Sequence, residues 1–323
     1  MIDQFERRID YMRLSITDRC NLRCTYCMPG GIRLKGHDDI LSYEEILRVC
    51  KAAVSLGIVR FKITGGEPLV RLGCTDFITE LKRLPGVEQV TITTNGILLP
   101  DNLDALCDAS IDGINISLDT LCDEQYQELT GWKQGSASAI KSILEKCIER
   151  GIKTKVNTVL LAETFDSLPH MAALAAEFPI AVRFIELMPF GSATAMSGTP
   201  MDCAFRILQE IYTDLRPDNT VMGNGPARYF VSDKLKGRIG FIDAVSHSFC
   251  AQCNRVRLTA TGTLKLCLSY NQETNLKELL RNSYSEENLR NALEESIKQK
   301  PQAHCFSEPD NITEQRTMNR IGG

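Results

Sequence analysis

Short apolar runs rich in β-branched residues alternate with longer segments of helical periodicity through the first 200 residues. The runs predict strands at 13–17, 59–64, 89–94, 112–118, 154–161 and 181–187. Apolar residues at helical spacing predict helices at 42–57, 75–84, 101–109, 136–151 and 165–178. This alternation is typical of parallel βαβ units. Because six such strands are too few to close a (β/α)8 barrel, we predict an α/β fold with an incomplete (β/α)6 TIM-like barrel.

The alternation ends near residue 200. Residues 198–212 predict a helix, residues 224–243 and 256–268 predict two hairpins, and residues 275–282 and 285–300 predict charged helices. We therefore predict two domains. Residues 1–205 would form the partial barrel, and residues 206–323 a C-terminal α+β cap.

Composition and charge exclude several classes of protein. The chain has 323 residues, 43% of them hydrophobic and 24% charged, as in an ordinary globular protein. A net charge of -4 provides no basic footprint for nucleic acid. The charged first 20 residues lack the apolar core of a secretory signal, and no run approaches the ~18 apolar residues of a membrane span. We expect a cytoplasmic protein with neither a nucleic acid nor a membrane as partner.

The chain contains thirteen cysteines, and in a reducing cytosol clustered cysteines indicate metal binding or catalysis more often than disulfides. Cys20, Cys24 and Cys27 form a C-x3-C-x2-C motif in the loop after the first predicted strand. Disulfide pairing would leave one thiol over, and a closed structural zinc site needs four ligands. An iron–sulfur cluster held by three thiolates, with one iron open to an outside ligand, is the third alternative.

A second group of three cysteines lies near the C-terminus. Cys250 and Cys253 form C-x2-C, and Cys267 follows across a predicted hairpin. A zinc knuckle completed by His247 and a second cluster with an open iron both fit this spacing. A substrate heteroatom, a water molecule or another side chain would occupy the open iron. The remaining cysteines are scattered, and we expect buried small hydrophobic residues there.

The segment GGEP, residues 65–68, follows the second predicted strand. Its glycines allow the backbone to approach a ligand closely. The carboxylate of Glu67 can accept a hydrogen bond from an ammonium group. By itself the segment is also compatible with an ordinary turn.

Basic residues lie on or beside the predicted strands: Arg13, Arg60, Lys62, Lys155, Arg183, Arg255 and Arg257. Strand alternation puts Arg60 and Lys62 on one face, and Arg255 and Arg257 on one face. Buried charges of the same sign are costly unless they are neutralised. Local carboxylates or a polyanionic substrate such as a triphosphate would neutralise them. The chain has neither a P-loop nor a G-x-G-x-x-G motif, so side chains would bind any nucleotide.

The cysteine motif after the first strand, with Tyr26 before its last cysteine and GGEP after the second strand, resembles the radical S-adenosylmethionine superfamily. Three further features resemble one family within it, that of molybdenum-cofactor biosynthesis protein A, the GTP 3′,8-cyclases. They are RLSITDRCNLRCTYCMP (13–29), SHSFCAQCNRVRLTATGTLKLCL (246–268) and the terminal IGG. The resemblance extends over nearly the whole chain.

The resemblance implies a lyase with two [4Fe-4S] clusters. The cluster at Cys20, Cys24 and Cys27 would cleave S-adenosylmethionine to a 5′-deoxyadenosyl radical, which takes the hydrogen from C3′ of GTP. The resulting carbon radical would attack C8 and give (8S)-3′,8-cyclo-7,8-dihydroguanosine 5′-triphosphate, in the first step of molybdenum cofactor biosynthesis. The second cluster, at Cys250, Cys253 and Cys267, would hold the purine. The implied partners are an electron donor such as flavodoxin or ferredoxin and the downstream cyclic pyranopterin monophosphate synthase, and a homodimer is left open.

Matching of motifs assigns the S-adenosylmethionine site to Tyr26, Gly66, Ser117 and Met188. It assigns GTP to Arg13, Lys62, Thr93, Lys155, Arg255, Val256 and Arg257, and no side chain to the chemistry itself. The family often has lysine at position 60 and arginine at position 62, the reverse of Arg60 and Lys62 here, which leaves open which of them meets phosphate. The Gly322–Gly323 tail matches a double glycine that is thought to reach the active site.

Two other hypotheses stay open. A peptide-modifying radical enzyme with auxiliary clusters would need more suitably spaced cysteines than the isolated Cys305. A non-catalytic protein that binds zinc or senses iron would leave GGEP and the cations on the strands without a purpose.

Overall fold

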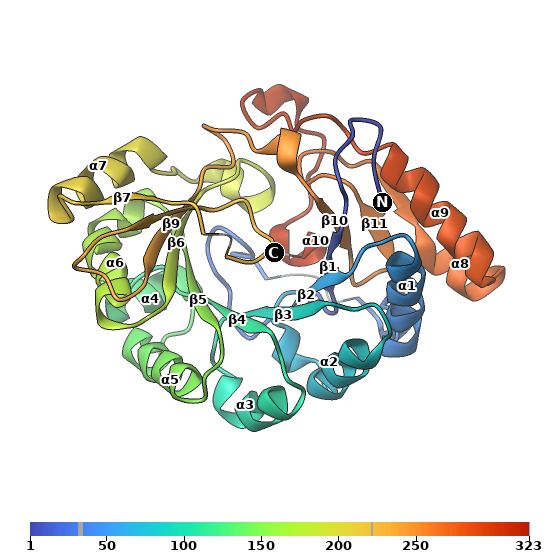
Figure 1. The fold of residues 1–323 in the computed structure, drawn as a ribbon, viewed down its shortest axis with the longest axis horizontal. Coiled ribbons are helices and arrows are strands. Elements are labelled where there is room, and N and C mark those ends of the chain that lie inside the picture. Colours follow the sequence, from blue (N-terminus) through green and yellow to red (C-terminus); the bar gives the residue numbers. More distant parts are fainter. Residues whose placement is uncertain (32–34, 221, 323) are drawn as a thin grey trace.

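Six parallel strands form the centre of one curved sheet, and helices cover its outer side (Figure 1). The computed structural model describes residues 1–31, 35–220 and 222–322. The central strands follow the order of the sequence, because each connection returns the chain along the outer face before the next strand. They are β1 (Tyr11–Ser15), β2 (Arg60–Thr64), β3 (Gln89–Thr94), β4 (Gly113–Ser117), β5 (Thr154–Leu160) and β6 (Ala181–Glu186).

The helices between these strands are amphipathic and bury their apolar face against the sheet. Five lie where the sequence predicts them, and α4 was not predicted. Only Tyr126, Leu129 and Thr130 of α4 are buried, so its apolar periodicity is too weak to recognise. The helices are α1 (Tyr43–Ser55), α2 (Cys74–Arg83), α3 (Leu99–Asp108), α4 (Asp123–Thr130), α5 (Ala137–Glu149) and α6 (Leu168–Glu177).

The chain after α7 (Met201–Ile211) extends the sheet at both edges. Strand β9 (Arg238–Ile242) pairs in parallel with β6, and β10 (Arg255–Leu258) pairs in parallel with β1. Both predicted hairpins are confirmed, as β8 (Arg228–Val231) with β9, and β10 with β11 (Thr263–Lys265). The outermost strands are β7 (Arg216–Asp218) and β12 (Glu273–Asn275). The boundary at residue 205 stays a prediction.

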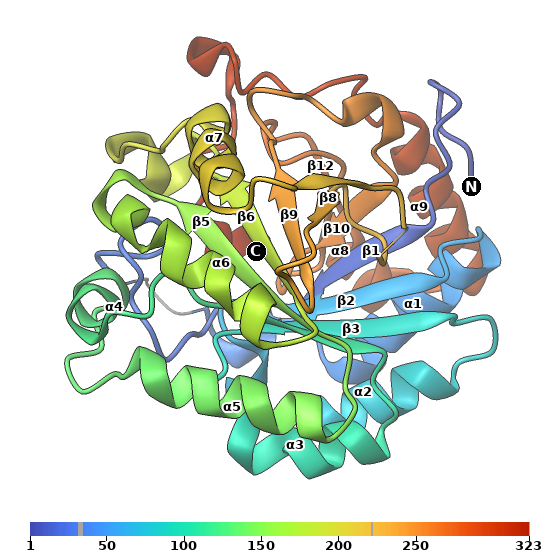
Figure 2. The same ribbon diagram turned by 60° about the vertical axis from the view of Figure 1, so that its left-hand side comes forward.

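Two helices of the C-terminal segment, α8 (Leu276–Asn282) and α9 (Glu286–Lys298), lie outside the sheet next to α1 (Figure 1). The main core fills the space between the sheet and its helices. A smaller apolar cluster of Phe190, Phe306 and Ile321 holds α10 (Met318–Ile321). The C-terminus lies inside the ring of strands in both views (Figures 1 and 2). No helix in the described ranges is long and apolar enough to cross a membrane.

Candidate active site

The two cysteine triads lie at opposite ends of the parallel strands. Cys20, Cys24 and Cys27 follow the carboxyl end of β1. Cys250 and Cys253 directly precede β10, which is parallel to β1, so they lie at the amino ends. Strand β11 is antiparallel to β10 and therefore brings Cys267, two residues after its end, to the same side. Only the first triad lies at the carboxyl ends, where parallel α/β folds usually place their chemistry.

The thiols of the first triad are close enough to influence one another. Burial raises the pKa of both Cys24 and Cys27, and the thiol of Cys20 and the carboxylate of Asp119 contribute in the same direction. The pKa of Cys27 is raised to about 12, and Cys27 in turn raises the pKa of Cys24. The hydroxyl of Tyr26 donates to Oδ2 of Asp119 at 2.9 Å. Burial raises the pKa of Asp119 to about 6. The structure thus places Tyr26, predicted for the S-adenosylmethionine site, against a carboxylate to which the sequence assigned no role.

The two glycines of GGEP lie against the backbone of the cysteine loop. The amide of Gly66 donates to the carbonyl of Thr17 at 2.8 Å. A Cβ on Gly65 would lie 2.6 Å from the same oxygen, and a Cβ on Gly66 would overlap the Arg19 carbonyl. The glycines are therefore needed because two loops of the site touch here.

Glu67 joins the GGEP segment to the loop after β3. Its Oε1 accepts from the hydroxyl of Thr94 at 2.8 Å, and its Oε2 accepts from the amide of Asn95 at 2.7 Å. Burial raises the pKa of Glu67 to about 7 although these hydrogen bonds lower it. Both carboxylate oxygens already have partners within the chain, which fixes the position of the loop.

The other predicted S-adenosylmethionine residues lie at the same end of the barrel. Ser117 is the last residue of β4, and Met188 follows β6 by two residues. Met188 packs against the small cluster that contains Ile321 of the C-terminal helix. The structure thus brings the four candidates to the carboxyl ends of the strands, beside the first triad.

Three predicted substrate cations lie in one row across neighbouring strands. Arg13 of β1 is in register with Arg257 of β10 on one side and with Lys62 of β2 on the other. Burial, and then the nearby positive charges, lower the pKa of Lys62 and of Arg257 well below the usual range. The side chain of Lys62 makes no hydrogen bond or ion pair with any residue in the described ranges. This row therefore has an excess of positive charge that the residues described by the structure do not neutralise at Lys62.

Arg60 differs from Lys62 although both lie on the same face of β2. Its guanidinium forms an ion pair with Asp10 at 2.7 Å and lies 3.6 Å from Glu88. Carboxylates of the chain therefore neutralise Arg60. Of the two positions that the family comparison left open, Lys62 is the one that is available to an anion.

Further polar residues lie along the inner side of β3 to β6. Nη2 of Arg183 donates to Oδ1 of Asn115 at 2.7 Å, and Asn115 is in register with both Thr93 and Lys155. Burial, followed by the charges of Arg183 and Lys153, lowers the pKa of Lys155 to about 7. Together with the row of Arg257, Arg13 and Lys62, the side chains of Lys155 and Arg183 form one cationic region on the inner side of the sheet. It extends toward the amino ends of the strands.

The loop between β7 and β8 lies against this cationic region. Nζ of Lys155 donates to the carbonyl of Met222 at 2.6 Å. A Cβ on Gly225 would lie 3.9 Å from Nη1 of Arg183. A hollow of about 370 Å³ is lined by residues of this loop and of β8. The loop therefore covers Lys155 and Arg183 at the amino ends of the strands.

The consecutive residues of β10 do not share one environment. Arg257 is buried, and Arg255 lies over the ring of Phe249 with 4.9 Å to the centroid. Val256 between them points to the opposite face and packs in the main core. A contact of Val256 with a substrate would therefore be made by its backbone.

The second triad lies among cations, in contrast to the first. Burial would raise the pKa of Cys253, but Lys300 and Arg255 outweigh it and lower the pKa to about 6. The hydroxyl of Ser269 lies 3.4 Å from Sγ of Cys267. The positive surroundings favour the thiolate form that a metal ligand requires.

The zinc hypothesis required His247 to be the fourth ligand of the second triad, but the structure pairs His247 with a carboxylate. The exposed His247 pairs with Asp243, with 3.0 Å between Nδ1 and the carboxylate. The amide of His304 instead donates to Sγ of Cys250 at 3.3 Å. These contacts disfavour a zinc knuckle completed by His247.

The C-terminal tail enters the barrel between the triads. Nη1 of Arg257 donates to the carbonyl of Gly322. A Cβ on Gly322 would lie 2.7 Å from Cβ of Ser15 and 3.1 Å from Oγ1 of Thr64, so only glycine fits this position. The backbone of Asn319 donates toward the thiol of Cys27. Gly323 lies outside the described residues.

The two triads fit iron–sulfur clusters by the chemistry of their donors. The six thiols are free of disulfides, and N–H groups donate to sulfur in both triads, from Leu22 to Cys20 at 3.4 Å and from His304 to Cys250. No group of three or more His, Cys, Asp or Glu side chains in the described part of the chain is arranged to hold a metal ion as it stands. The assignment to iron therefore depends on the chemistry of the thiols and on the resemblance of the two cysteine motifs.

Three residues that the structure brings to the site had no role assigned from the sequence. The carboxylate of Asp119 accepts from Tyr26 beside the first triad, the amide of His304 donates to Cys250, and Lys300 lowers the pKa of Cys253. All three act through contacts with residues far away in the chain, for which the sequence carries no pattern. Arg183, by contrast, was among the cations that the sequence places on strands, and the structure brings it to Asn115 in the barrel.

Comparisons with known proteins agree with this geometry. The model of the Radical SAM superfamily matches residues 14–175, and the model described as Molybdenum Cofactor Synthesis C matches residues 180–306. The structure of Streptococcus suis SuiB bound to S-adenosylmethionine has the same fold, with a TM-score of 0.66 and 15% identity over 97% of this chain and 78% of that chain. SuiB bound to the precursor peptide SuiA gives a TM-score of 0.64 and 16% identity over 98% and 77%. The chain is a radical S-adenosylmethionine enzyme, and its cofactors include S-adenosylmethionine and an iron–sulfur cluster.

Relatives of similar length narrow the family. The GTP 3′,8-cyclases of Clostridium perfringens strain 13 and of Petrotoga mobilis are each 41% identical to it, over 325 and 329 residues that cover 100% of both chains. That of Moorella thermoacetica is 40% identical over 329 residues, again with full coverage. The chain belongs to the GTP 3′,8-cyclase family.

Proposed function

We propose that this protein cyclises GTP to (8S)-3′,8-cyclo-7,8-dihydroguanosine 5′-triphosphate, the first step of molybdenum cofactor biosynthesis. The observation that supports it most directly is the row of Arg257, Arg13 and Lys62 between the two cysteine triads. A triphosphate would supply the negative charge that the described residues do not provide at Lys62. The names of the relatives agree with this substrate.

The first triad would hold one [4Fe-4S] cluster, with Tyr26, Gly66, Ser117 and Met188 around S-adenosylmethionine. When bound, the cluster and S-adenosylmethionine supply the 5′-deoxyadenosyl radical that takes a hydrogen atom from C3′ of GTP. Glu67 holds the GGEP segment and the loop after β3 in fixed positions through its two carboxylate oxygens. Asp119 orients the ring of Tyr26 beside the thiols. These residues hold the reacting groups in position, which is the main task of a protein that binds such a cofactor.

The second triad, Cys250, Cys253 and Cys267, would hold a second [4Fe-4S] cluster with an open iron for the purine. The cations around Cys253 favour thiolate ligands. They lie at the end of the barrel where the row of basic residues proposed to bind the triphosphate begins. GTP would therefore lie along the strands, with contacts from Arg13, Lys62, Thr93, Lys155, Arg255, Arg257 and the backbone of Val256. The tail at Gly322 would exclude water from the side of the first triad.

The remaining assignments follow from this reaction. A flavodoxin or ferredoxin would deliver two electrons, one to cleave S-adenosylmethionine and one, with a proton, to reduce the purine radical that remains after C3′ bonds to C8. Cyclic pyranopterin monophosphate synthase would take up the product. The protein would function in the cytoplasm, where its thiols stay reduced. In a homodimer, each chain would still form its own barrel with both triads. The two proposed domains are residues 1–205 and 206–323.

Anaerobic reconstitution tests this function directly. Iron and sulfide are counted per chain, then GTP, S-adenosylmethionine and a reductant are added and the nucleosides are analysed by mass. About eight irons per chain, 5′-deoxyadenosine and a product with the mass of GTP are expected. Cleavage of S-adenosylmethionine with unchanged GTP would refute the substrate, and zinc without cleavage would refute the radical chemistry. A modified peptide in place of cyclised GTP would favour the peptide-modifying alternative.

A further inference from the structure

The root of the C-terminal tail is attached to the loop that carries Cys267. We use "C-terminal tail" for residues 313–322 and "Cys267 loop" for residues 265–270. The amides of Thr313 and Glu314 both donate to the carbonyl of Ser269, at 3.1 and 3.3 Å. Since the hydroxyl of Ser269 lies 3.4 Å from Sγ of Cys267, one residue touches both the tail and the second triad.

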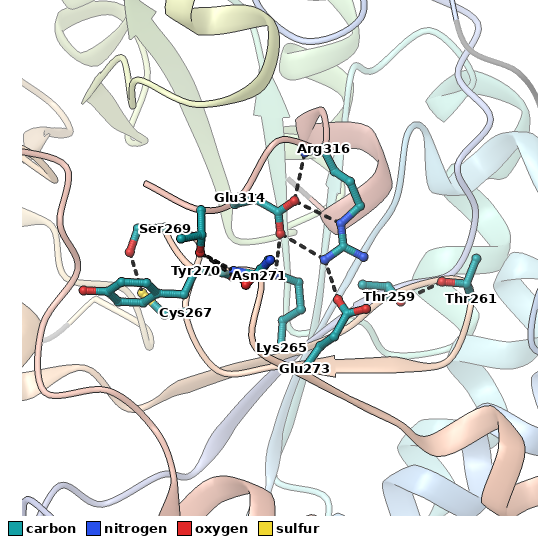
Figure 3. A network of polar contacts seen from close by, with 11 residues as sticks. Thr259, Thr261, Lys265, Cys267, Ser269, Tyr270, Asn271, Glu273, Glu314 and Arg316 are labelled. Carbon is teal, nitrogen blue, oxygen red and sulfur yellow. Dashed lines mark hydrogen bonds and ion pairs between the residues drawn. The ribbon is translucent and has the colours of Figure 1, made fainter. Parts of the chain in front are cut away.

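A network of charges around the buried pair of Lys265 and Glu314 strengthens this attachment (Figure 3). The ammonium group of Lys265 pairs with Glu314 and also donates to the carbonyl of Tyr270 at 2.8 Å. The side chains of Lys265 and Glu314 are 0% and 1% exposed. The other oxygen of Glu314 accepts from the amide and Nε of Arg316 at 2.8 and 3.0 Å, and Arg316 also pairs with Glu273 of β12. Burial would raise the pKa of Glu314, but Arg316 and Lys265 outweigh it and lower the pKa to about 2.

The far end of the tail reaches the barrel a few residues later. Asn319 donates to the carbonyl of Asp18 at 3.1 Å, and Ile321 is fully buried. Gly322 then lies between Ser15 and Thr64. The segment between Glu314 and Asn319 is short, so the position of the root restricts where Gly322 can lie.

The Cys267 loop is in turn held at both ends by buried lysines. Lys265 precedes Cys267 by two residues, and Nζ of Lys300 donates to the carbonyl of Leu266. An unfolded Cys267 loop would remove both the Ser269 carbonyl and the ammonium group of Lys265 from the tail. A ligand that orders this loop would therefore also order the tail, and coupling of this kind is reciprocal.

We propose that Glu314 is a positioning residue that couples the second triad to the tail: loading of a cluster at Cys267 orders the Cys267 loop, and Glu314 transmits this order to Gly322 in the barrel. This coupling rests on the proposed function, because it requires a cluster at the second triad. The tail would then close the barrel only after both triads have received their clusters.

Hydrogen exchange of the tail tests the coupling without an activity assay. Peptides that span residues 315–322 are followed by mass spectrometry before and after anaerobic reconstitution with iron and sulfide. In the wild type, reconstitution is expected to slow exchange of the tail about 5- to 150-fold, the usual range of coupling between sites. In Glu314→Gln the slowing should be lost while the iron and sulfide counts match those of the wild type. Cys267→Ala should also lose it while the first triad keeps its iron.

Two further variants separate this role from a general effect on folding. Asp233→Asn breaks the exposed pair with Arg216 at the opposite edge of the sheet, and its tail should behave as in the wild type. Lys265→Met/Glu314→Leu removes both charges together, which buried pairs often tolerate in stability, and it should still lose the slowing. Slowing that persists in Glu314→Gln or in the double variant would overturn the role of Glu314. About eight irons per chain in a wild type without slowing would overturn the coupling alone, whereas about four irons would overturn the second cluster and the coupling with it.

Discussion

Replacing Lys62 by methionine separates a residue that binds substrate from one that supports the fold. Lys62 lies in register with Arg13, and its side chain makes no hydrogen bond or ion pair with the described residues. Burial and the charges of Arg183, Arg13, Lys155 and Arg255 lower its pKa well below the usual value. Methionine keeps most of the volume and removes the charge. We therefore expect Lys62→Met to bind GTP more weakly and the free protein to become more stable.

The two effects have different magnitudes. A hydrogen bond to a charged group contributes about 1.5–3 kcal/mol, so the Kd for GTP should rise about 10- to 150-fold. Removing a repelled charge from a functional site is expected to stabilise the free protein by about 0.5–2 kcal/mol. Anaerobic titration calorimetry at one fixed salt concentration measures the first effect. Urea unfolding of the protein without GTP measures the second.

The pH dependence of stability gives an independent sign. Because the folded protein lowers the pKa of Lys62, the unfolded chain binds more protons between that lowered pKa and the usual value of 10.5. The free energy of unfolding therefore rises with pH over this interval. Lys62→Met should lose this part of the rise, and an unchanged slope would contradict the assigned electrostatic surroundings.

Arg60→Met is the matched control, two residues earlier on the same face of β2. Its loss removes the ion pair with Asp10, so we expect a destabilisation of about 1 kcal/mol and an unchanged Kd for GTP. The two variants should thus differ in the sign of the stability change and in GTP affinity. Normal GTP binding together with lower stability in Lys62→Met would refute the reasoning.

Three further predictions concern the two triads and the GGEP segment that lies against the loop of the first triad. Cys253→Ser should still cleave S-adenosylmethionine but should not turn over GTP, and cyclised product from this variant would rule out the role given to the second cluster. Cys253 has a pKa lowered to about 6 and Cys27 a pKa raised to about 12, and only the thiolate reacts with iodoacetamide. In protein without metal at pH 7, iodoacetamide should therefore modify Cys253 before Cys27. Peptide mass mapping that shows the opposite order would contradict the cationic surroundings assigned to Cys253. Gly66→Ala should lower the free energy of unfolding by about 1–3 kcal/mol, since its Cβ would overlap the Arg19 carbonyl, whereas Gly30→Ala, with nothing within 4 Å, should leave it unchanged in urea unfolding. Equal stability of the two alanine variants would contradict the close contact of the loops.

The sequence by itself determined the features that depend on neighbours along the chain. The spacing of Cys20, Cys24 and Cys27 fixes three thiols on one loop, and the alternation of apolar runs predicts all six central strands within about two residues. Both hairpins of the C-terminal segment were also predictable, because turn residues and strand periodicity are local. The helix α4 was missed because few of its side chains are buried.

Only the tertiary structure decided which of these local features meet. Pairing of β10 with β1 places Arg257 beside Arg13 and brings the second triad to the opposite end from the first. Contact with Asp10 neutralises Arg60 and leaves Lys62 available, although both are cations on one face of one strand. The hydrogen bond from Arg257 to Gly322 and the ion pair of Glu314 with Lys265 likewise join segments that are far apart in the chain. Such contacts depend on which strands and loops bury each other, and the energy of that burial is a property of the folded chain that no short stretch of sequence contains.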